Sequence, residues 1–167
     1  MPTGSLLSTN KVALVCHCLL DPLTRAQGTK PLRRDFIPVL VAEDVSLLQL
    51  PCPELIFGFV RAPCNKEDYD TPQYRYHCRT IAQDTIHIIE AYTRAHFQIC
   101  GLISIGGSPS CGCQRTHVQG EHVSEPGIFI EELQVVLNEA SIALNITDHE
   151  LLTEKSSIHA FLGKKEE

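Results

Sequence analysis

The sequence predicts an α/β fold: a three-layer, Rossmann-like domain with a mostly parallel sheet and helices on both faces. Short apolar runs typical of buried strands alternate with longer segments in which apolar residues recur at helical spacing. Strands separated by helices form βαβ units, whose strands run parallel and are covered on both faces. We expect one domain over residues 1–167, with a core over about 11–144 and flexible ends.

The first half supplies two predicted strands and a short helix. Residues 11–18 (KVALVCHC) form an apolar run bounded by polar residues, which predicts a buried strand. Residues 46–50 (SLLQL) predict a second strand that stops at Pro51. Between them, the apolar spacing of residues 35–45 (DFIPVLVAEDV) favours a short helix.

The second half supplies a long helix, a strand and another helix. The helix is expected from Pro72 to Phe97, with Asp70 and Thr71 as the N-cap region and proline in the first turn. Residues 98–105 (QICGLISI) predict the third strand. Residues 124–144 then repeat the helical pattern, with one apolar stripe made of Phe129, Leu133, Val136, Leu137, Ala140 and Leu144.

Composition excludes several classes of protein. The longest apolar runs are far shorter than the ~20 residues that span a bilayer, and the first ten residues lack the basic and apolar regions of a signal peptide. We therefore expect a cytoplasmic protein without a membrane partner. The net charge of −6 disfavours a nucleic-acid partner, which needs clustered Lys and Arg. Nothing in the sequence specifies an oligomeric state.

The chain has eight cysteines, and three of them follow predicted strands. Cytosolic thiols are kept reduced, so a cysteine-rich cytosolic chain indicates metal binding or catalysis rather than disulfides. Cys18, Cys52 and Cys111 each lie in a strand-end loop near proline or glycine. Ligands bind outside the carboxyl ends of parallel strands, so three loops distant in sequence can meet at one site.

The sequence gives weaker evidence that the other five cysteines bind a metal. Packing in the core is the simpler interpretation for three of them, Cys64 lies in a polar loop and could be a spare thiol, and Cys113 is either a substitute ligand or incidental. The three assigned to the core are Cys16, Cys78 and Cys100.

No CxxC pair is present among the three candidates, which argues against thioredoxin-like chemistry and against a structural zinc site. Three thiolates without a fourth ligand leave one position open, as catalytic sites do. An iron–sulfur cluster would then expose one iron able to bind a soft atom of a substrate. The alternative is a core of reduced cysteines without a metal.

Several motifs resemble the thiouracil desulfidase (TudS) family, and more closely its short, single-domain, TudS-related branch. The likeness runs from about Lys11 to Leu144. The motifs are HCLLDPLTRAQG (17–28), QLPCPEL (49–55), YDTPQYRYHCR (69–79), GGSPSCG (106–112) and GIFIEEL (127–133). The chain departs from the family pattern at Ala26 and Gln27, where better-known members have Tyr-Asp, and at GFVRAP (58–63), which shortens a Gly-Gly-Leu-x-x-Pro-Arg motif.

The resemblance implies a 4Fe-4S cluster held by Cys18, Cys52 and Cys111, with a fourth iron that has no protein ligand. It implies a non-redox enzyme that removes sulfur from a thiocarbonyl of a thiolated nucleobase or related small molecule and releases sulfide. A non-enzymatic iron–sulfur binding or sensing protein, and a desulfidase acting on thiolated tRNA, are the alternatives. A zinc or mononuclear iron site would differ in its metal and lack labile sulfide.

Roles for further residues follow from this resemblance and from their position. Ser108 is expected to supply an active-site hydroxyl, and Glu54, or else Glu131, to carry the proton. Each has a simpler interpretation, because serine satisfies turns and Glu131 lies in a predicted first helical turn.

Positively charged and glycine residues complete the expected site. Arg25 and Arg61 are candidates to bind an anionic group of the substrate, or else form surface salt bridges. We expect backbone N–H groups to donate hydrogen bonds to cluster sulfides. These N–H groups belong to Gly106, Gly107 and Gly112.

Overall fold

Four parallel strands form the central sheet of the computed structural model, which describes residues 9–59 and 61–164. Their order across the sheet is β2-β1-β3-β6, and the pairing is parallel throughout. A separate two-stranded antiparallel hairpin joins β4 and β5. The strands are β1 (Lys11–Val15), β2 (Ser46–Gln49), β3 (Gln98–Ser104), β4 (Thr116–Val118), β5 (Glu121–Val123) and β6 (Ile146–Asp148).

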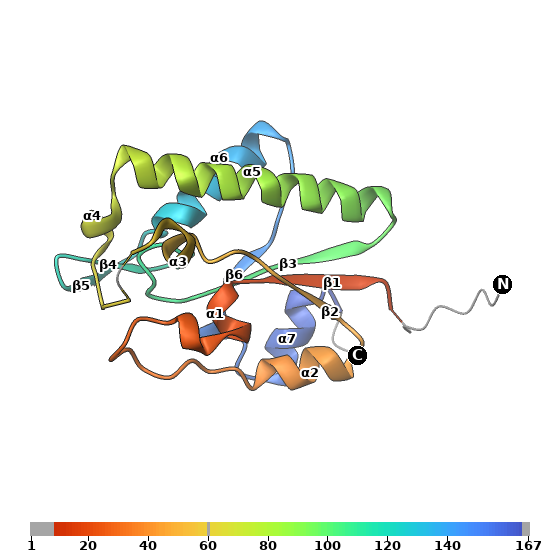
Figure 1. Cartoon of the computed structure of the whole chain (residues 1–167). Coiled ribbons are helices and arrows are strands. Elements are labelled where there is room, and N and C mark those ends of the chain that lie inside the picture. The colour runs from red at the N-terminus through yellow and green to blue at the C-terminus, as the bar shows by residue number, and fades with distance from the viewer. Residues whose placement is uncertain (1–8, 60, 165–167) are drawn as a thin grey trace.

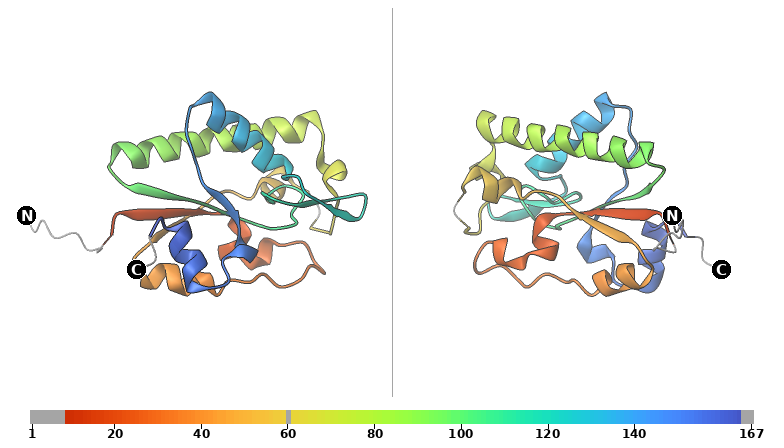
Figure 2. Two further views of the ribbon diagram at one scale, coloured as in Figure 1. Left: turned by 180° about the vertical axis from the view of Figure 1, so that it is seen from behind. Right: turned by 45° about the vertical axis from the view of Figure 1, so that its right-hand side comes forward.

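Helices cover both faces of this sheet, which confirms the predicted three-layer α/β fold. In Figures 1 and 2, α5 and α6 lie on one face, whereas α1, α2 and α7 lie on the other. The α-helices are α1 (His17–Leu20), α2 (Phe36–Ala42), α3 (Pro53–Phe57), α4 (Lys66–Tyr69), α5 (Pro72–Arg94), α6 (Ile128–Glu139) and α7 (Lys155–Phe161), with the 3-10 helices η1 (Pro22–Thr24) and η2 (His149–Leu151).

The first strand is shorter than the apolar run predicts. Val12 to Val15 are buried, but the strand ends there and Cys16 becomes the N-cap of α1. The prediction that the strand reaches residue 18 is therefore wrong, because periodicity does not mark where an apolar chain turns into a helix. Cys18 consequently lies in the single turn of α1, directly beyond the end of β1.

The long helix α5 begins as predicted. The Thr71 side chain accepts a hydrogen bond from the Tyr74 N–H at 3.2 Å, and Pro72 occupies the first turn. The helix ends at Arg94 rather than Phe97, because His96 takes a left-handed conformation with φ of 62°. Its buried stripe includes Tyr74 and Cys78, as the helical spacing indicates.

The second long helix, α6, spans Ile128–Glu139, so the expected range 124–144 is too long at both ends. Gly127 ends the preceding loop, and Ser141 has a positive φ of 56° just after the helix. The core also extends past the expected limit at Leu144. The strand β6 pairs with β3, and Ile158 and Phe161 of α7 are buried.

The connections place the carboxyl end of β1 at a topological switch point. The chain leaves β1 towards β2 on one side and returns to β3 on the other. In doubly wound folds, ligands bind in the crevice at this point. Over the described residues, no helix is both long and apolar enough to cross a bilayer.

Candidate functional site

A cavity of about 560 Å³ lies at the carboxyl ends of β1, β2 and β3, and its lining includes the thiols of Cys18, Cys52 and Cys111. Cys18 comes from α1 after β1, and Cys52 is the N-cap of α3 after β2. Cys111 lies in the loop that follows β3. The structure thus brings together three residues that are separated by 34 and 59 positions in the sequence.

Short backbone contacts hold these cysteines in place. The Cys52 Sγ accepts a hydrogen bond from the Leu55 N–H at 3.4 Å, in the manner of a helix cap. The Cys111 carbonyl accepts one from the Ile105 N–H at 3.1 Å, which folds the loop back onto the end of its strand. The thiols are therefore positioned by the ends of regular elements.

Burial keeps the three side chains in the thiol form in the absence of a metal. Burial, followed by the nearby Cys16 and Cys52 thiols, raises the pKa of Cys18 to about 12. Burial also raises the pKa of Cys52. A hydrogen bond with the Cys16 thiol, and then burial, raise the pKa of Cys111 well above its ordinary value. A bound metal inverts this preference, since a coordinating thiol is deprotonated.

Ser108 organises the loop that carries Cys111. Its Oγ accepts hydrogen bonds from the N–H groups of Cys111 at 2.9 Å and Ser110 at 3.3 Å. This is the turn-stabilising role that serine often has. The hydroxyl also lines the cavity, and its hydrogen is not used in these two bonds, so it can donate to a group in the cavity.

The glycines of the loop do not present free N–H groups to the cavity. The N–H of Gly106 donates to His149 Nδ1, that of Gly107 to the Arg115 carbonyl and that of Gly112 to the Ser108 carbonyl, at 3.1 to 3.3 Å. These N–H groups already have protein acceptors here, and their expected hydrogen bonds to cluster sulfides stay a prediction. Glycine is needed for space instead, because a Cβ at Gly112 would lie 2.3 Å from the Arg115 carbonyl oxygen.

Glu54 lies in the same cavity, in the first turn of α3, and is 8% exposed. Its Oε2 forms a salt bridge with the Arg61 guanidinium and accepts a hydrogen bond from the Tyr69 hydroxyl at 3.4 Å. Arg61 is anchored in turn by its Nε, which donates to the Thr24 carbonyl at 2.6 Å. Both contacts use Oε2, so Oε1 is the oxygen left to act in the cavity.

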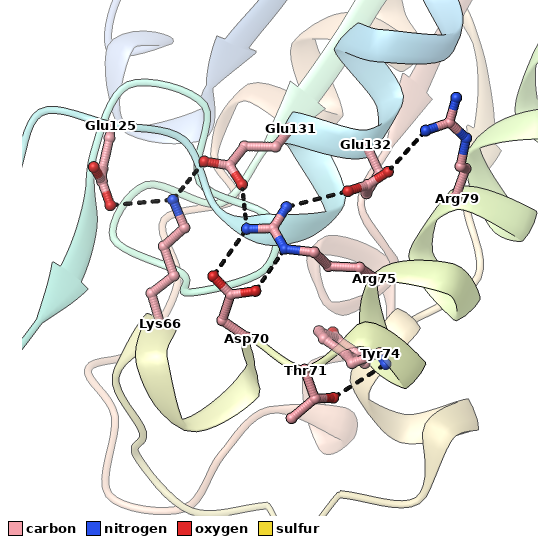
Figure 3. Close-up of polar contacts among 9 residues, drawn as sticks. All are labelled: Lys66, Asp70, Thr71, Tyr74, Arg75, Arg79, Glu125, Glu131 and Glu132. Carbon is pink, nitrogen blue, oxygen red and sulfur yellow. Dashed lines mark hydrogen bonds and ion pairs between the residues drawn. The ribbon is translucent and has the colours of Figure 1, made fainter.

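Glu131 points elsewhere, into an ion-pair network between α4, α5 and α6 (Figure 3). Its carboxylate contacts Lys66 Nζ at 2.6 Å and the Arg75 guanidinium at 2.9 Å. Arg75 also binds Asp70 and Glu132. The structure therefore does not bring Glu131 to the cavity with the thiols, and its role is to join the helices.

The rim of the cavity carries positive groups. Arg25 lines it, as expected, and its guanidinium donates to the Lys30 carbonyl. In the described parts of the chain, neither Arg25 nor Lys30 has a carboxylate partner, whereas Arg115 pairs with Glu150 at 2.5 Å. This leaves two uncompensated cations beside the thiols.

Sequence reasoning missed three histidines of the cavity lining, His117, His122 and His149. His117 and His122 face one another across the hairpin with ring centroids 3.9 Å apart, and the neighbouring His117 lowers the pKa of His122. Burial lowers the pKa of His149. The alternating segment THVQGEHV, with Gln119-Gly120 as a tight turn, is a hairpin signal that could have found the first two.

Asp148 was also missed, and it fixes the chain just after Cys111. Its buried carboxylate accepts hydrogen bonds from the Ser104 hydroxyl at 2.6 Å, the Cys113 N–H at 3.0 Å and the Gln114 N–H at 3.2 Å. No local pattern marks this residue, since its partners lie more than 30 positions away.

The remaining cysteines separate by location. Cys78 and Cys100 are buried in the core, as expected. Cys113 lies outside the cavity, with its Sγ 3.7 Å from the Ile146 carbonyl oxygen. Cys64 lines the cavity, and Cys16 is buried in the core, as expected.

The side chains around the cavity include the soft thiol ligands that an iron–sulfur cluster takes. Among the described residues, no three side chains of His, Cys, Asp or Glu converge closely enough to hold one metal ion. The ligands of an iron–sulfur cluster bind different irons, so they need not meet at one point. Three soft thiols around a cavity, with no fourth ligand required, fit such a cluster.

No protein-family model matches the chain. The chain is 27% identical over 146 residues to the uncharacterized protein MJ0003 of Methanocaldococcus jannaschii, covering 83% of this chain and 90% of that protein. Among solved structures, it is similar to the 4Fe-4S-dependent thiouracil desulfidase TudS, with a TM-score of 0.60 and 19% identity over 87% of this chain and 95% of that one. The chain therefore has the TudS-like fold that its motifs indicate.

Proposed function

We propose that this protein is a 4Fe-4S-dependent, non-redox desulfidase that removes sulfur from the thiocarbonyl of a thiolated nucleobase or related small molecule. The observation that carries the proposal is the cavity in which Cys18, Cys52 and Cys111 meet beside Glu54 and Ser108. The three thiols would hold the cluster. The fold shared with a 4Fe-4S-dependent thiouracil desulfidase supports this assignment.

When bound, the cluster would supply a Lewis acid, an iron without a protein ligand, that polarises the thiocarbonyl bond. Side chains of the protein would transfer the protons. Glu54 Oε1 would take a proton from the water that adds to the thiocarbonyl carbon, while Oε2 stays fixed by Arg61 and Tyr69. Glu54 would return this proton to the sulfur as the C–S bond breaks, so that a carbonyl forms and the sulfur leaves as sulfide. Ser108 would donate its hydroxyl hydrogen to the substrate atom that gains negative charge.

The positive charges on the rim of the cavity favour a substrate with an anionic group. Arg25 and Lys30 line the cavity without carboxylate partners among the described residues, so their charge is available to a ligand. Arg61 is instead committed to Glu54, which makes it a positioning residue in this proposal. A small thiolated molecule with a phosphate or carboxylate group would place its sulfur beside the three cysteines and its negative charge beside Arg25 and Lys30.

The first experiment measures iron and acid-labile sulfide per chain in protein purified without oxygen, together with its visible spectrum. We expect about four of each per chain, as a cubane cluster requires. Cys111→Ala should lose both, whereas the matched variant Cys100→Ala, which removes a buried thiol outside the cavity, should keep them. Reconstituted wild type with neither iron nor sulfide would overturn the proposal.

The second experiment follows sulfide release from thiouracil and from its phosphorylated nucleoside, using the loaded protein. Release that depends on Cys111 and Glu54 supports a desulfidase. A fully loaded protein that releases no sulfide from either compound would instead favour an iron–sulfur binding or sensing role. Release only from thiolated tRNA would point to the tRNA enzyme.

A further inference from the structure

A buried histidine, His149, lines the cavity and has no part in the chemistry proposed above. It is 3% exposed and directly follows β6, the strand that pairs with the end of β3. The residue before it, Asp148, is fixed by hydrogen bonds from the Ser104 hydroxyl and the Cys113 N–H. The fourth strand of the sheet thus holds a polar side chain at the same carboxyl edge, where ligands bind in folds of this kind.

One hydrogen bond determines which nitrogen of this ring carries the proton. The Gly106 N–H donates to His149 Nδ1 at 3.3 Å. A backbone N–H can only donate, so Nδ1 is unprotonated and the proton of the neutral ring lies on Nε2. Burial also disfavours the charged ring, since it lowers the pKa of His149. His149 is therefore a neutral imidazole with an N–H donor at Nε2.

This Nε2 donor is left for a ligand. Within residues 9–59 and 61–164, no hydrogen bond or ion pair joins Nε2 to another side chain or to the backbone. Over the same residues, Thr116 Oγ1 is the one fully buried side-chain nitrogen or oxygen that lacks a partner, so Nε2 is not sealed inside the core. Because Nδ1 is turned towards Gly106 and the side chain lines the cavity, Nε2 is the ring nitrogen that a group in the cavity can reach.

We propose that His149 is a specificity-determining residue whose Nε2–H donates a hydrogen bond to an exocyclic oxygen of the thiolated substrate. Oxygen is a better acceptor for this N–H than the reacting sulfur, because sulfur accepts hydrogen bonds weakly. An anionic group is drawn instead to Arg25 and Lys30, which line the rim without carboxylate partners in the described residues. A neutral donor inside the cavity is therefore matched to a neutral carbonyl.

A donor with a fixed proton also discriminates against some substrates. An amino group in place of the carbonyl would bring two N–H donors face to face and leave both unpaired, which costs binding energy. The inference rests on the proposed function for the nature of the substrate, and it selects heterocycles that carry both a sulfur and an oxygen. Thiouracil belongs to this class, whereas thiocytosine has an amino group where thiouracil has its oxygen.

The first test needs neither a cluster nor activity. NMR of metal-free wild type with isotope-labelled histidine distinguishes protonated from unprotonated ring nitrogens, and the loss of signals in His149→Asn identifies those of His149. We expect a neutral ring with the proton on Nε2. A ring protonated on Nδ1 would overturn the proposal, because the donor would then belong to the wrong edge of the ring.

The second test compares kcat/KM for thiouracil and thiocytosine in the loaded protein. In His149→Asn, the amide oxygen can replace Nδ1 as the acceptor for the Gly106 N–H, but no donor remains at the position of Nε2. We expect the preference for thiouracil to fall by ~3- to 10-fold, the usual worth of one hydrogen bond, with iron content and thermal unfolding unchanged. His149→Gln, whose amide can place a donor near that position, should retain the preference.

The matched control is His87→Asn, at an exposed position of α5, which should keep the wild-type ratio of the two rates. An unchanged ratio in His149→Asn, or an equal loss for both bases, would overturn the proposal. Loaded wild type that acts on neither base would contradict the proposed function, and the choice of substrate inferred from His149 with it. The NMR measurement on wild type stands apart from that outcome, and it decides the state of the ring even where a variant fails to fold.

Discussion

At the residue scale, burial and partners give Glu54 its proposed role. The sequence alone does not separate it from a surface carboxylate. In the structure it is nearly buried, and Arg61 and Tyr69 hold one of its oxygens. Because both contacts use Oε2, Oε1 is the oxygen left to act in the cavity.

We expect Glu54→Gln to lower sulfide release by about 10² to 10⁴-fold, the usual contribution of a general base, with iron content unchanged. The amide keeps the shape of the side chain but cannot accept the proton. Steady-state sulfide release and iron analysis on the same sample check this. Glu90→Gln, an exposed position on α5, is the control and should behave as wild type. Equal rates in the two variants would remove Glu54 from the mechanism.

The raised pKa of Cys18 predicts a loss of stability of the metal-free chain in alkali. Its pKa is about 12 in the folded state against an ordinary value of 9.0, so the unfolded chain loses its proton first as the pH rises. The stabilisation is therefore complete below about pH 9 and disappears between pH 9 and 12. Urea midpoints measured from pH 7 to 11 should fall more steeply for wild type than for Cys18→Ala. Parallel curves would show that Cys18 is not buried as a thiol.

At the scale of elements, the loop with Cys111 is held from two helices. The Tyr74 hydroxyl of α5 and the Ser110 hydroxyl lie 2.7 Å apart, and both residues are fully buried. From α6, the Ile128 N–H donates to the Pro109 carbonyl at 2.9 Å, and the Gly127 N–H before it donates to the Gly112 carbonyl at 2.8 Å. The loop is thus fixed by helices that do not themselves supply a ligand.

We expect Tyr74→Phe to lower the free energy of unfolding by about 1–3 kcal/mol, because it leaves the buried Ser110 hydroxyl without its partner. The double variant Tyr74→Phe with Ser110→Ala should recover part of this loss, since both polar groups are then gone. Urea unfolding of the two single variants and the double variant measures the coupling. Fully additive effects would mean that the hydrogen bond does not stabilise the loop.

At the scale of the whole molecule, the C-terminal segment completes both the sheet and the core. The strand β6 pairs with the end of β3, and Asp148 at its end holds the chain after Cys111. On the other face, Phe161 of α7 packs on Gly101, where an added Cβ would lie 2.8 Å from the ring. The segment after residue 144 therefore holds the chain that follows Cys111, through Asp148, and packs on β3, through Phe161.

We expect Phe161→Ala to destabilise the fold by about 3–5 kcal/mol, the usual cost of emptying a buried aromatic site. Leu151→Ala, at a position that is 48% exposed, should change stability little. Thermal and urea unfolding of both variants provide the comparison. Similar, small effects in the two would contradict the assignment of α7 to the core.

The sequence by itself determined the fold class, the long helix α5 and three cysteines that follow strands. These features depend on local periodicity and on residues adjacent in the chain, such as Thr71 and Pro72 before α5. Helix ends were less well predicted, because His96 and Ser141 adopt left-handed conformations that composition does not reveal.

Only the tertiary structure decided which side chains share the cavity. It placed Glu54 inside and Glu131 in an ion-pair network, although both are acids in the first turn of a helix. It also set Asp148 against Cys113, 35 positions away, and His149 against Gly106. Such contacts depend on how strands pair and loops return to them, and those long-range pairings leave no pattern within any short segment of the chain.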